Sequence, residues 1–476
     1  MLLILGLTAF GQQSNTLYLL HDIPQSNLMN PAVQLECKWF VGIPVLSSVH
    51  ASYSNTAFTY HDLANGEYWD LEQVLDQMHR VDLFGGESML QAVSVGYKHK
   101  SYYFSFHISE RAYMYQRIPR SSAELVIRGN SSYVGETARF NAFRSSGYYN
   151  REYAFGVSKA VDQFFTLGLR AKLLFGKANV STGRSNMNLI TGPNTFELQM
   201  EGDYTLNSSL PITIVQDPDG DITNILLDEI NYAELLMNRR NPGISFDLGV
   251  IYSYDEKLTL SASLLDLGIM RWSTQLNKVS ASGVFNYDEL DTGTTTVSWD
   301  FFNEFMDSVY NSFDITVSQE PYVSFLPAQL FLGANYQLND KLSLGTVNRN
   351  VLFRGKLHSS LTFQATTQLA DKFLATLSWS YLNHSIKNLG AGIAYYGKGL
   401  QFHLVTDNFL GFFYPFDTRT INLRMGVNLM LGCPRDKKSK LQNESYGRMP
   451  GGGKCSWTER PGKRDRKMHR AARKQN

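Results

Sequence analysis

The chain has 476 residues, of which 13% are aromatic and 18% are charged, and its formal net charge is +1 at pH 7. That length suits several soluble domains or one large barrel. Beyond the first dozen residues there is no run of about 18 apolar residues, so the composition excludes a helical membrane protein.

The N-terminal stretch, MLLILGLTAFG, is a short apolar run that ends in small residues. We expect residues 1–11 to be a signal peptide, although the usual basic n-region is missing. Residues 12–36 contain two prolines and alternate poorly between polar and apolar positions. They are therefore expected to form an N-terminal periplasmic segment or plug rather than a strand of the wall.

Residues 37–433 alternate between apolar and polar positions with a period of two, which is typical of β-strands. Each strand is close to the length that crosses a bilayer at a tilt. Fourteen strands are predicted, near residues 38–55, 92–98, 101–112, 148–160, 163–181, 243–254, 258–271, 327–337, 341–352, 357–369, 372–383, 389–396, 400–407 and 420–432.

Tight turns and long connections alternate along these strands, as in bacterial outer-membrane barrels. The fold class predicted is therefore all-β, a transmembrane antiparallel up-and-down barrel with a short N-terminal plug. Residues 113–147 and 182–206 could hold a further hairpin, and 223–238 and 298–313 have helical periodicity. Pro44 cannot donate to a strand ladder, so a bulge or a gap is expected there.

Alternation also predicts which ionisable side chains face the lumen. Between Leu264 and Leu265 the apolar phase slips, which suggests a bulge that turns Asp266 inward. Because charged groups inside a barrel are costly unless paired or hydrated, they either anchor the plug or line a path. The predicted lumen-facing residues are Arg170, Lys172, Asp247, Asp266, His358 and Arg424.

Three cysteines, Cys37, Cys433 and Cys455, are too few for a disulfide scaffold or a zinc site. Cys37 precedes the first strand and Cys433 ends the last, and these strands must pair to close the barrel. Two interpretations remain open: a Cys37–Cys433 bridge in an oxidising periplasm, or three unpaired thiols.

The segment 434–476 carries 14 Lys or Arg against 4 Asp or Glu, whereas residues 1–433 hold 30 basic and 39 acidic residues. With almost nothing apolar to bury, the segment is expected to be a disordered periplasmic tail. Its expected contacts are a periplasmic partner, peptidoglycan or anionic lipid, and not nucleic acid; a tail without a partner is the alternative.

Catalytic signatures are missing from the sequence, which has no G-x-S-x-G, no H-E-x-x-H and no glycine-rich phosphate loop. His107 and Ser109 share a strand, but both fall on its inward side, where a lipid-cleaving site would not meet its substrate. We therefore expect no enzyme activity, no metal and no cofactor.

Three stretches resemble a family of Bacteroidota outer-membrane β-barrels to which no activity is assigned. They are Gly42-Ile43-Pro44-Val45-Leu46, Val405-Thr406-Asp407-Asn408-Phe409, and the ending from Asn422-Leu423-Arg424 through Gly432-Cys433. The resemblance spans about residues 14 to 433. It implies this fold and a location in the outer membrane of a Gram-negative bacterium.

Asn30-Pro31-Ala32, just before the first strand, is similar to the hatch motif of the long-chain fatty-acid transporter superfamily, whose barrels also have fourteen strands. In that superfamily the N-terminal segment plugs the lumen, and a kinked strand opens sideways to lipid. The candidate plug here is shorter than is usual in the superfamily.

Two functions are carried forward. The first is a channel or transporter for a small hydrophobic molecule, as the hatch-like motif implies. The second is a non-transporting scaffold or assembly partner in a cell-envelope secretion or gliding machine, which the basic tail and long loops suggest.

Overall fold

A computed structural model of the chain describes residues 14–65, 68–193, 197–216, 218, 222–228, 237–287, 312–353, 356–370 and 372–433. The expected signal peptide and the basic tail lie outside the described residues. In the part of the chain that is described, no helix is both long enough and apolar enough to cross a membrane.

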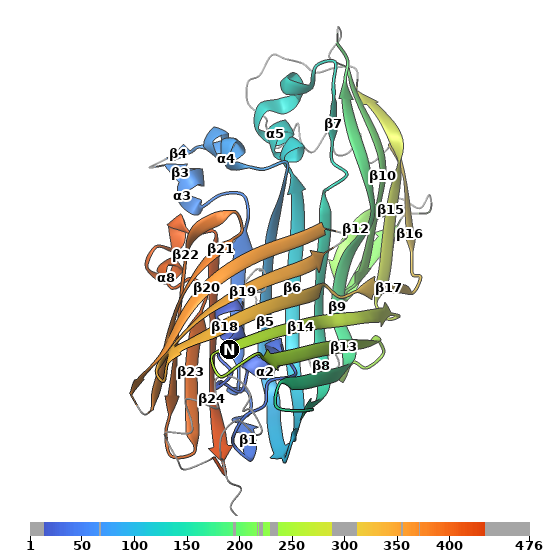
Figure 1. Cartoon of the computed structure of the whole chain (residues 1–476). Helices are drawn as coiled ribbons and strands as arrows, with labels where there is room; N and C mark the ends of the chain where they lie inside the picture. The colour runs from blue at the N-terminus through green and yellow to red at the C-terminus, as the bar shows by residue number, and fades with distance from the viewer. Residues whose placement is uncertain are drawn as a thin grey trace, which may run out of the picture.

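Fourteen antiparallel strands, the first of them interrupted, close into one barrel (Figure 1). The sequence-based fold class is confirmed. The ring closes because β24 pairs with both halves of the first strand, which pair in turn with β5. In ring order the strands are β1 (Trp39–Gly42) with β2 (Val49–Asn55), β5 (Val81–His99), β6 (Tyr102–Pro119), β8 (Arg144–Ala160), β9 (Phe165–Thr191), β13 (Pro242–Ser253), β14 (Leu258–Trp272), β18 (Ala328–Asn339), β19 (Leu342–Phe353), β20 (Lys356–Ala370), β21 (Phe373–Leu382), β22 (Ser385–Tyr396), β23 (Leu400–Thr406) and β24 (Thr420–Leu431).

Side chains on these strands alternate between an exposed apolar outer face and a buried polar inner face. On β21, Phe373, Leu377 and Trp379 are exposed, while Thr376, Ser378 and Ser380 are buried. An apolar belt around a polar interior is what a barrel needs to span a bilayer. One end of the barrel carries the short turns and both chain ends of the wall; we call it the short-turn end, and the other the long-loop end.

At the long-loop end, part of the wall continues beyond the barrel as a sheet, which we call the crown (Figure 1). The crown consists of the last third of β9 together with β10 (Leu198–Ser209), β15 (Leu276–Tyr287) and β16 (Phe313–Ser318). The short β17 (Tyr322–Phe325) joins it back to β14. The additional hairpin allowed at 182–206 is therefore present, and β5 and β6 are longer than predicted.

The helix predicted for 223–238 is wrong in its first part. Residues of β12 (Ile222–Leu227) pair instead with β11 (Ile212–Gln216) in a separate hairpin, so cross-strand pairing overrides the local periodicity. The rest of that stretch, 229–236, and most of the other predicted helix, 298–311, lie outside the described residues.

Small elements cover part of the long-loop end. They include α3 (Tyr60–Leu63), β3 (Ala64–Asn65), β4 (Tyr68–Trp69), α4 (Leu71–Gln77), α5 (Arg120–Arg128), η1 (Gly129–Tyr133) and β7 (Thr137–Arg139). Helices α4 and α5 are tied by an ion pair between Glu72 and Arg128. The hydrogen bond from Arg128 lowers the pKa of the Glu72 carboxyl below its ordinary value.

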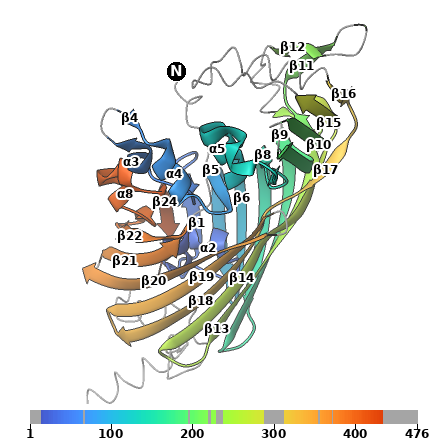
Figure 2. The same ribbon diagram turned by 90° about the horizontal axis from the view of Figure 1, so that it is seen from above.

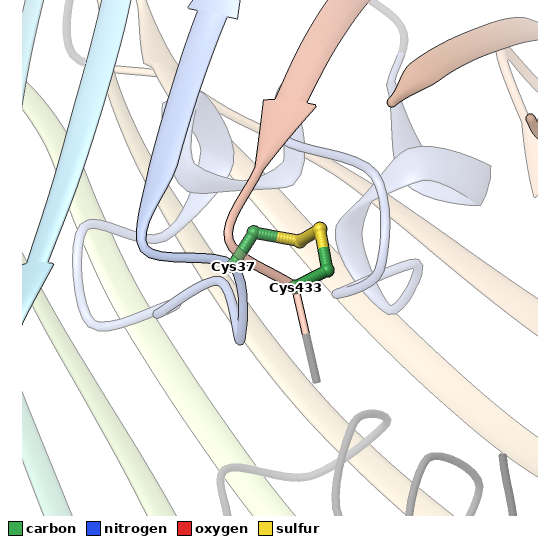
Figure 3. Close-up of a disulfide and its surroundings, with 2 residues drawn as sticks. All are labelled: Cys37 and Cys433. Atoms are coloured by element: carbon green, nitrogen blue, oxygen red, sulfur yellow. A yellow bond between two sulfur atoms is a disulfide. The ribbon is translucent and has the colours of Figure 1, made fainter. Parts of the chain in front are cut away.

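A disulfide between Cys37 and Cys433 joins the two ends of the barrel wall across 396 residues of sequence (Figure 3). Next to it, Trp39 pairs with Leu431, and the Lys38 amide donates to the Gly432 carbonyl at 3.3 Å. The bridge therefore staples the closing seam of the barrel at the short-turn end.

Replacing both cysteines, as Cys37→Ser with Cys433→Ser, should lower the stability of the folded barrel. Removing a native disulfide typically costs about 2–4 kcal/mol, because the unfolded chain regains conformational freedom. We expect the heat-induced shift in SDS gel mobility to occur at lower temperature in this variant, and in the reduced wild type. Cys455→Ser, in the tail, serves as the control. Equal transition temperatures for all three proteins would show that the seam does not need the bridge.

Candidate functional site

The N-terminal segment from Ser14 to Glu36 fills the lumen and forms a plug. It contains two single-turn helices, α1 (Asn15–Tyr18) and α2 (Ser26–Met29), and almost all of its side chains are buried. Seen along the barrel, α2 lies inside the ring of strands (Figure 2). The segment expected to be a periplasmic segment or plug thus lies inside the barrel.

The start of the plug is fixed to the wall by Asp407, at the end of β23. The carboxylate of Asp407 accepts hydrogen bonds from the Thr16 amide at 2.7 Å and the Asn15 amide at 3.3 Å. Asn422 of β24 donates to the same carboxylate at 2.8 Å. Because Asp407 is buried, these donors compensate for its desolvation and hold α1 against the wall.

The Asn30-Pro31-Ala32 motif turns the chain at the point where it presses on the wall. The Asn30 side-chain oxygen accepts from the Ala32 amide at 2.9 Å, and its amide nitrogen reaches carbonyls of β13 and β14 at 3.4 Å. Opposite the motif, Gly168 of β9 and Gly249 of β13 are paired residues. A Cβ on Gly168 would lie 2.3 Å from the Ala32 nitrogen, and one on Gly249 would lie 2.2 Å from the Asn30 oxygen. Only glycine leaves room for the plug here.

Arg170 of β9 links the plug to the wall by charge. Its guanidinium donates to the Asn27 and Leu28 carbonyls of α2 and forms an ion pair with Asp247 of β13 at 3.1 Å. Arg170 is 1% exposed and Asp247 is fully buried. Such a pair is stable only where the remaining hydrogen-bonding groups are also satisfied, and the plug carbonyls do this.

Beside this link lies a buried network of charged side chains from several strands. Lys172 contacts Asp247 at 2.8 Å and Asp266 at 2.6 Å. Arg111 contacts Asp266 at 2.9 Å and Glu87 at 2.7 Å. Asp266 has a positive φ of 62° at a register shift between β13 and β14, so the expected bulge does turn it inward. Together with Glu152, Gln329 and Arg349, these residues make up the lumen network.

The space left between the plug and the lumen network is small. A cavity of about 40 Å³ lies among Ser14, Leu28, Arg111, Asp266 and Arg424. That volume holds one or a few water molecules, far less than the roughly 300 Å³ of a typical ligand pocket. The lumen is therefore closed at this level.

Toward the long-loop end, the inward face of the wall changes from charged to apolar. On β6 the inward residues run from Arg111 to Tyr113 and Tyr115, and on β9 they run from Lys172 to Leu174. The apolar layer formed in this way consists of Tyr113, Tyr115, Tyr148, Leu174, Met270, Trp272, Leu276 and Leu326.

The first wall strand is broken between β1 and β2, where Pro44 was expected to disturb the pairing. Residues 43–48 form a turn in which the Leu46 amide donates to the Ile43 carbonyl, and Val45 has a positive φ of 68°. A β-branched residue rarely adopts this conformation, so the turn is strained. Val45 and Leu46 are 50% and 54% exposed on the outer surface. On the inside, the Gln25 side chain of the plug donates to the Ser47 carbonyl at 2.8 Å.

The residues predicted to face the lumen are found there. Arg170, Lys172, Asp247 and Asp266 are joined in one place, whereas Arg424 contacts Ser48 and Ser14. His358 is half-buried near the long-loop end of β20, on the same side as the buried Ser360.

Sequence reasoning missed several members of the network. Glu87 lay in a predicted connection, because β5 was expected to start eleven residues later. Arg111 was detectable, since it shares the inward side of its strand with His107 and Ser109. Arg349 lies on a strand with weaker alternation. Within the described residues there is no group of three or more His, Cys, Asp and Glu that could hold a metal ion.

The sequence profile of a family of unknown function, DUF5723, matches residues 31–407. The chain belongs to this family. No curated protein matches the chain by sequence.

Solved structures with a similar arrangement include three outer proteins of low identity. The toluene transporter TbuX of Ralstonia pickettii is 13% identical, with 89% of this chain and 97% of that chain covered and a TM-score of 0.42. A FadL homologue of Pseudomonas aeruginosa is 10% identical, with 90% and 100% covered and a TM-score of 0.39. The toluene transporter TodX of P. putida is 10% identical, with 89% and 94% covered and a TM-score of 0.36.

Arg170→Met should loosen the plug, because it removes both donors to α2 and leaves Asp247 with one cation fewer. Breaking a buried ion pair typically costs about 3–5 kcal/mol. The matched control is Arg184→Met, which removes an ion pair with Asp203 in the crown, where Arg184 is 73% exposed; an exposed pair contributes about 1 kcal/mol or less. Thermal unfolding of the two variants in detergent would measure the difference. Equal losses would mean that Arg170 does not anchor the plug.

Proposed function

We propose that this family member is an outer-membrane channel or transporter for a small hydrophobic molecule, and not an enzyme. The observation that carries the proposal is the layering of the lumen. An apolar layer lies toward the long-loop end, the charged network and the plug close the lumen below it, and a break in the wall lies beside the plug.

The layering favours a sideways route. Moving an apolar molecule through a sealed layer of paired charges would break those pairs and desolvate them, which is costly. At the wall break, by contrast, the outer side meets the apolar part of the membrane through Val45 and Leu46. The inner side is covered by Gln25, whose neutral side chain also exchanges hydrogen bonds with Asn428. Displacing Gln25 breaks neutral hydrogen bonds and no ion pair.

In this proposal the long-loop end faces the medium, and the short-turn end and the tail from 434 face the periplasm of a Gram-negative cell. The molecule would enter at the long-loop end, contact the apolar layer, and leave through the wall break into the membrane. The tail would contact a periplasmic partner or peptidoglycan.

Leu46→Asp should reduce uptake of a small apolar molecule, because a carboxylate at the outer mouth of the break is costly for an apolar molecule to pass. Uptake of radiolabelled toluene would be measured in cells that express the variant in place of the wild type. Leu361→Asp is the matched control, since Leu361 lies on the outer face of β20 away from the break, and its cost for membrane insertion is similar. Equal uptake by the two variants would argue against a route through the break.

The second candidate is a non-transporting scaffold in a cell-envelope machine. It is favoured by the crown, whose strands extend beyond the barrel wall and offer a surface that transport does not require (Figure 1). Co-purification of a stoichiometric envelope partner, together with unchanged toluene uptake after deletion of the gene, would favour this candidate over the first.

A further inference from the structure

A second irregularity in the wall lies on the far side of β24 from the break in the first strand. Strand β23 has seven residues and pairs only with Ala391–Tyr396 of β22 and Arg424–Leu429 of β24. On this side, residues 385–390 and 420–423 have no strand between them. The wall is continued there by the connection 407–419, through the Phe409 amide, which donates to the Leu389 carbonyl at 2.7 Å.

This connection contains α8 (Leu410–Phe413) and η2 (Pro415–Asp417), and its aromatic side chains are exposed. Phe413 is 73% exposed, Tyr414 61% and Phe416 59%, and Phe412 is exposed as well. Tyr60 of α3 lies against Phe416 with ring centroids 4.9 Å apart. We call these five residues the aromatic patch. Several large aromatic side chains exposed together in this way mark a surface that binds something.

The patch is continuous with the lipid-facing belt of the barrel. It begins beside Leu389, and the neighbouring outward residues of β21 and β22 include Trp379, Tyr381 and Ile386, all exposed on the outer face. The Trp379 indole donates to the Ile386 carbonyl at 2.9 Å, so this part of the belt reaches the end of the strands. Exposed Lys387 stands in the same row and could meet anionic headgroups.

We propose that the aromatic patch is a lipid-binding surface. In the membrane, α8 and η2 insert among the acyl chains of the leaflet at the long-loop end and complete the wall where β23 stops. Aromatic rings gain most from the boundary between headgroups and acyl chains, which is where this end of the belt lies. This goes beyond the transport proposal and holds whatever the channel carries.

The wall segment that carries the patch also holds the plug, because Asp407 at its start binds the Asn15 and Thr16 amides. Lipid bound to the patch therefore stabilises the segment against which α1 is docked. Lipid in this leaflet would act as a structural ligand of the closed state.

The test places a reporter on the patch in the full-length chain. Phe413→Cys, in a Cys455→Ser background that keeps the disulfide, is labelled with an environment-sensitive fluorophore. The protein is then reconstituted in phosphatidylethanolamine and phosphatidylglycerol vesicles that contain a quencher on the acyl chains. Two controls carry the same label: Phe363→Cys on the outer face of β20, and Val126→Cys on α5, which is 77% exposed.

We expect the label at 413 to lose most of its emission to the acyl-chain quencher, as at 363, and to resist iodide in the water. Two results would overturn the proposal. Quenching by iodide alone, as at 126, would place the patch in water. Protection from both quenchers would show that protein covers it, either a second copy or another chain. Gel mobility with and without heating shows that each variant is folded.

Discussion

The structure depends on one constraint: charges inside a closed barrel must find partners inside it. Arg111, Lys172 and Arg170 are buried, and the carboxylates of Glu87, Asp247 and Asp266 answer them at 2.6 to 3.1 Å. The wall alone does not satisfy Arg170, which needs the carbonyls of α2. The plug is therefore part of the electrostatic balance of the lumen, and removing it would leave a buried cation without its hydrogen bonds.

The same constraint separates the parts of the wall that can move from those that cannot. Around Asp266, several ion pairs would have to break together, so this side of the plug is fixed. At the wall break and at the end of β23, the plug meets the wall through the neutral Gln25 and through one carboxylate, Asp407. Both places also adjoin exposed apolar residues, Leu46 in one case and Phe412 in the other. Contact with lipid and contact with the plug thus occur at the same sites.

Much of the barrel was predictable, because period-two alternation is imposed by the two environments of the wall. It located fourteen strands, placed Arg170 and Asp247 inside, and found the bulge at Asp266 from a slip of phase. It did not find where strands end, since β5 and β9 continue into polar surroundings where alternation carries less signal. Nor could it show that Gly168 and Gly249 pair beneath Ala32. That contact joins residues more than a hundred positions apart in sequence, and local pattern contains nothing about it.

The central claim is that the plug is held in the lumen by this network, and hydrogen exchange tests it most directly. In the full-length protein in lipid nanodiscs, peptides from residues 14–36 should exchange their amide hydrogens as slowly as those of the wall strands, because the amides of Asn15, Thr16 and Ala32 are buried and bonded. Exchange of these peptides within seconds, while the strands remain protected, would contradict the account. It would show that the segment leaves the lumen freely.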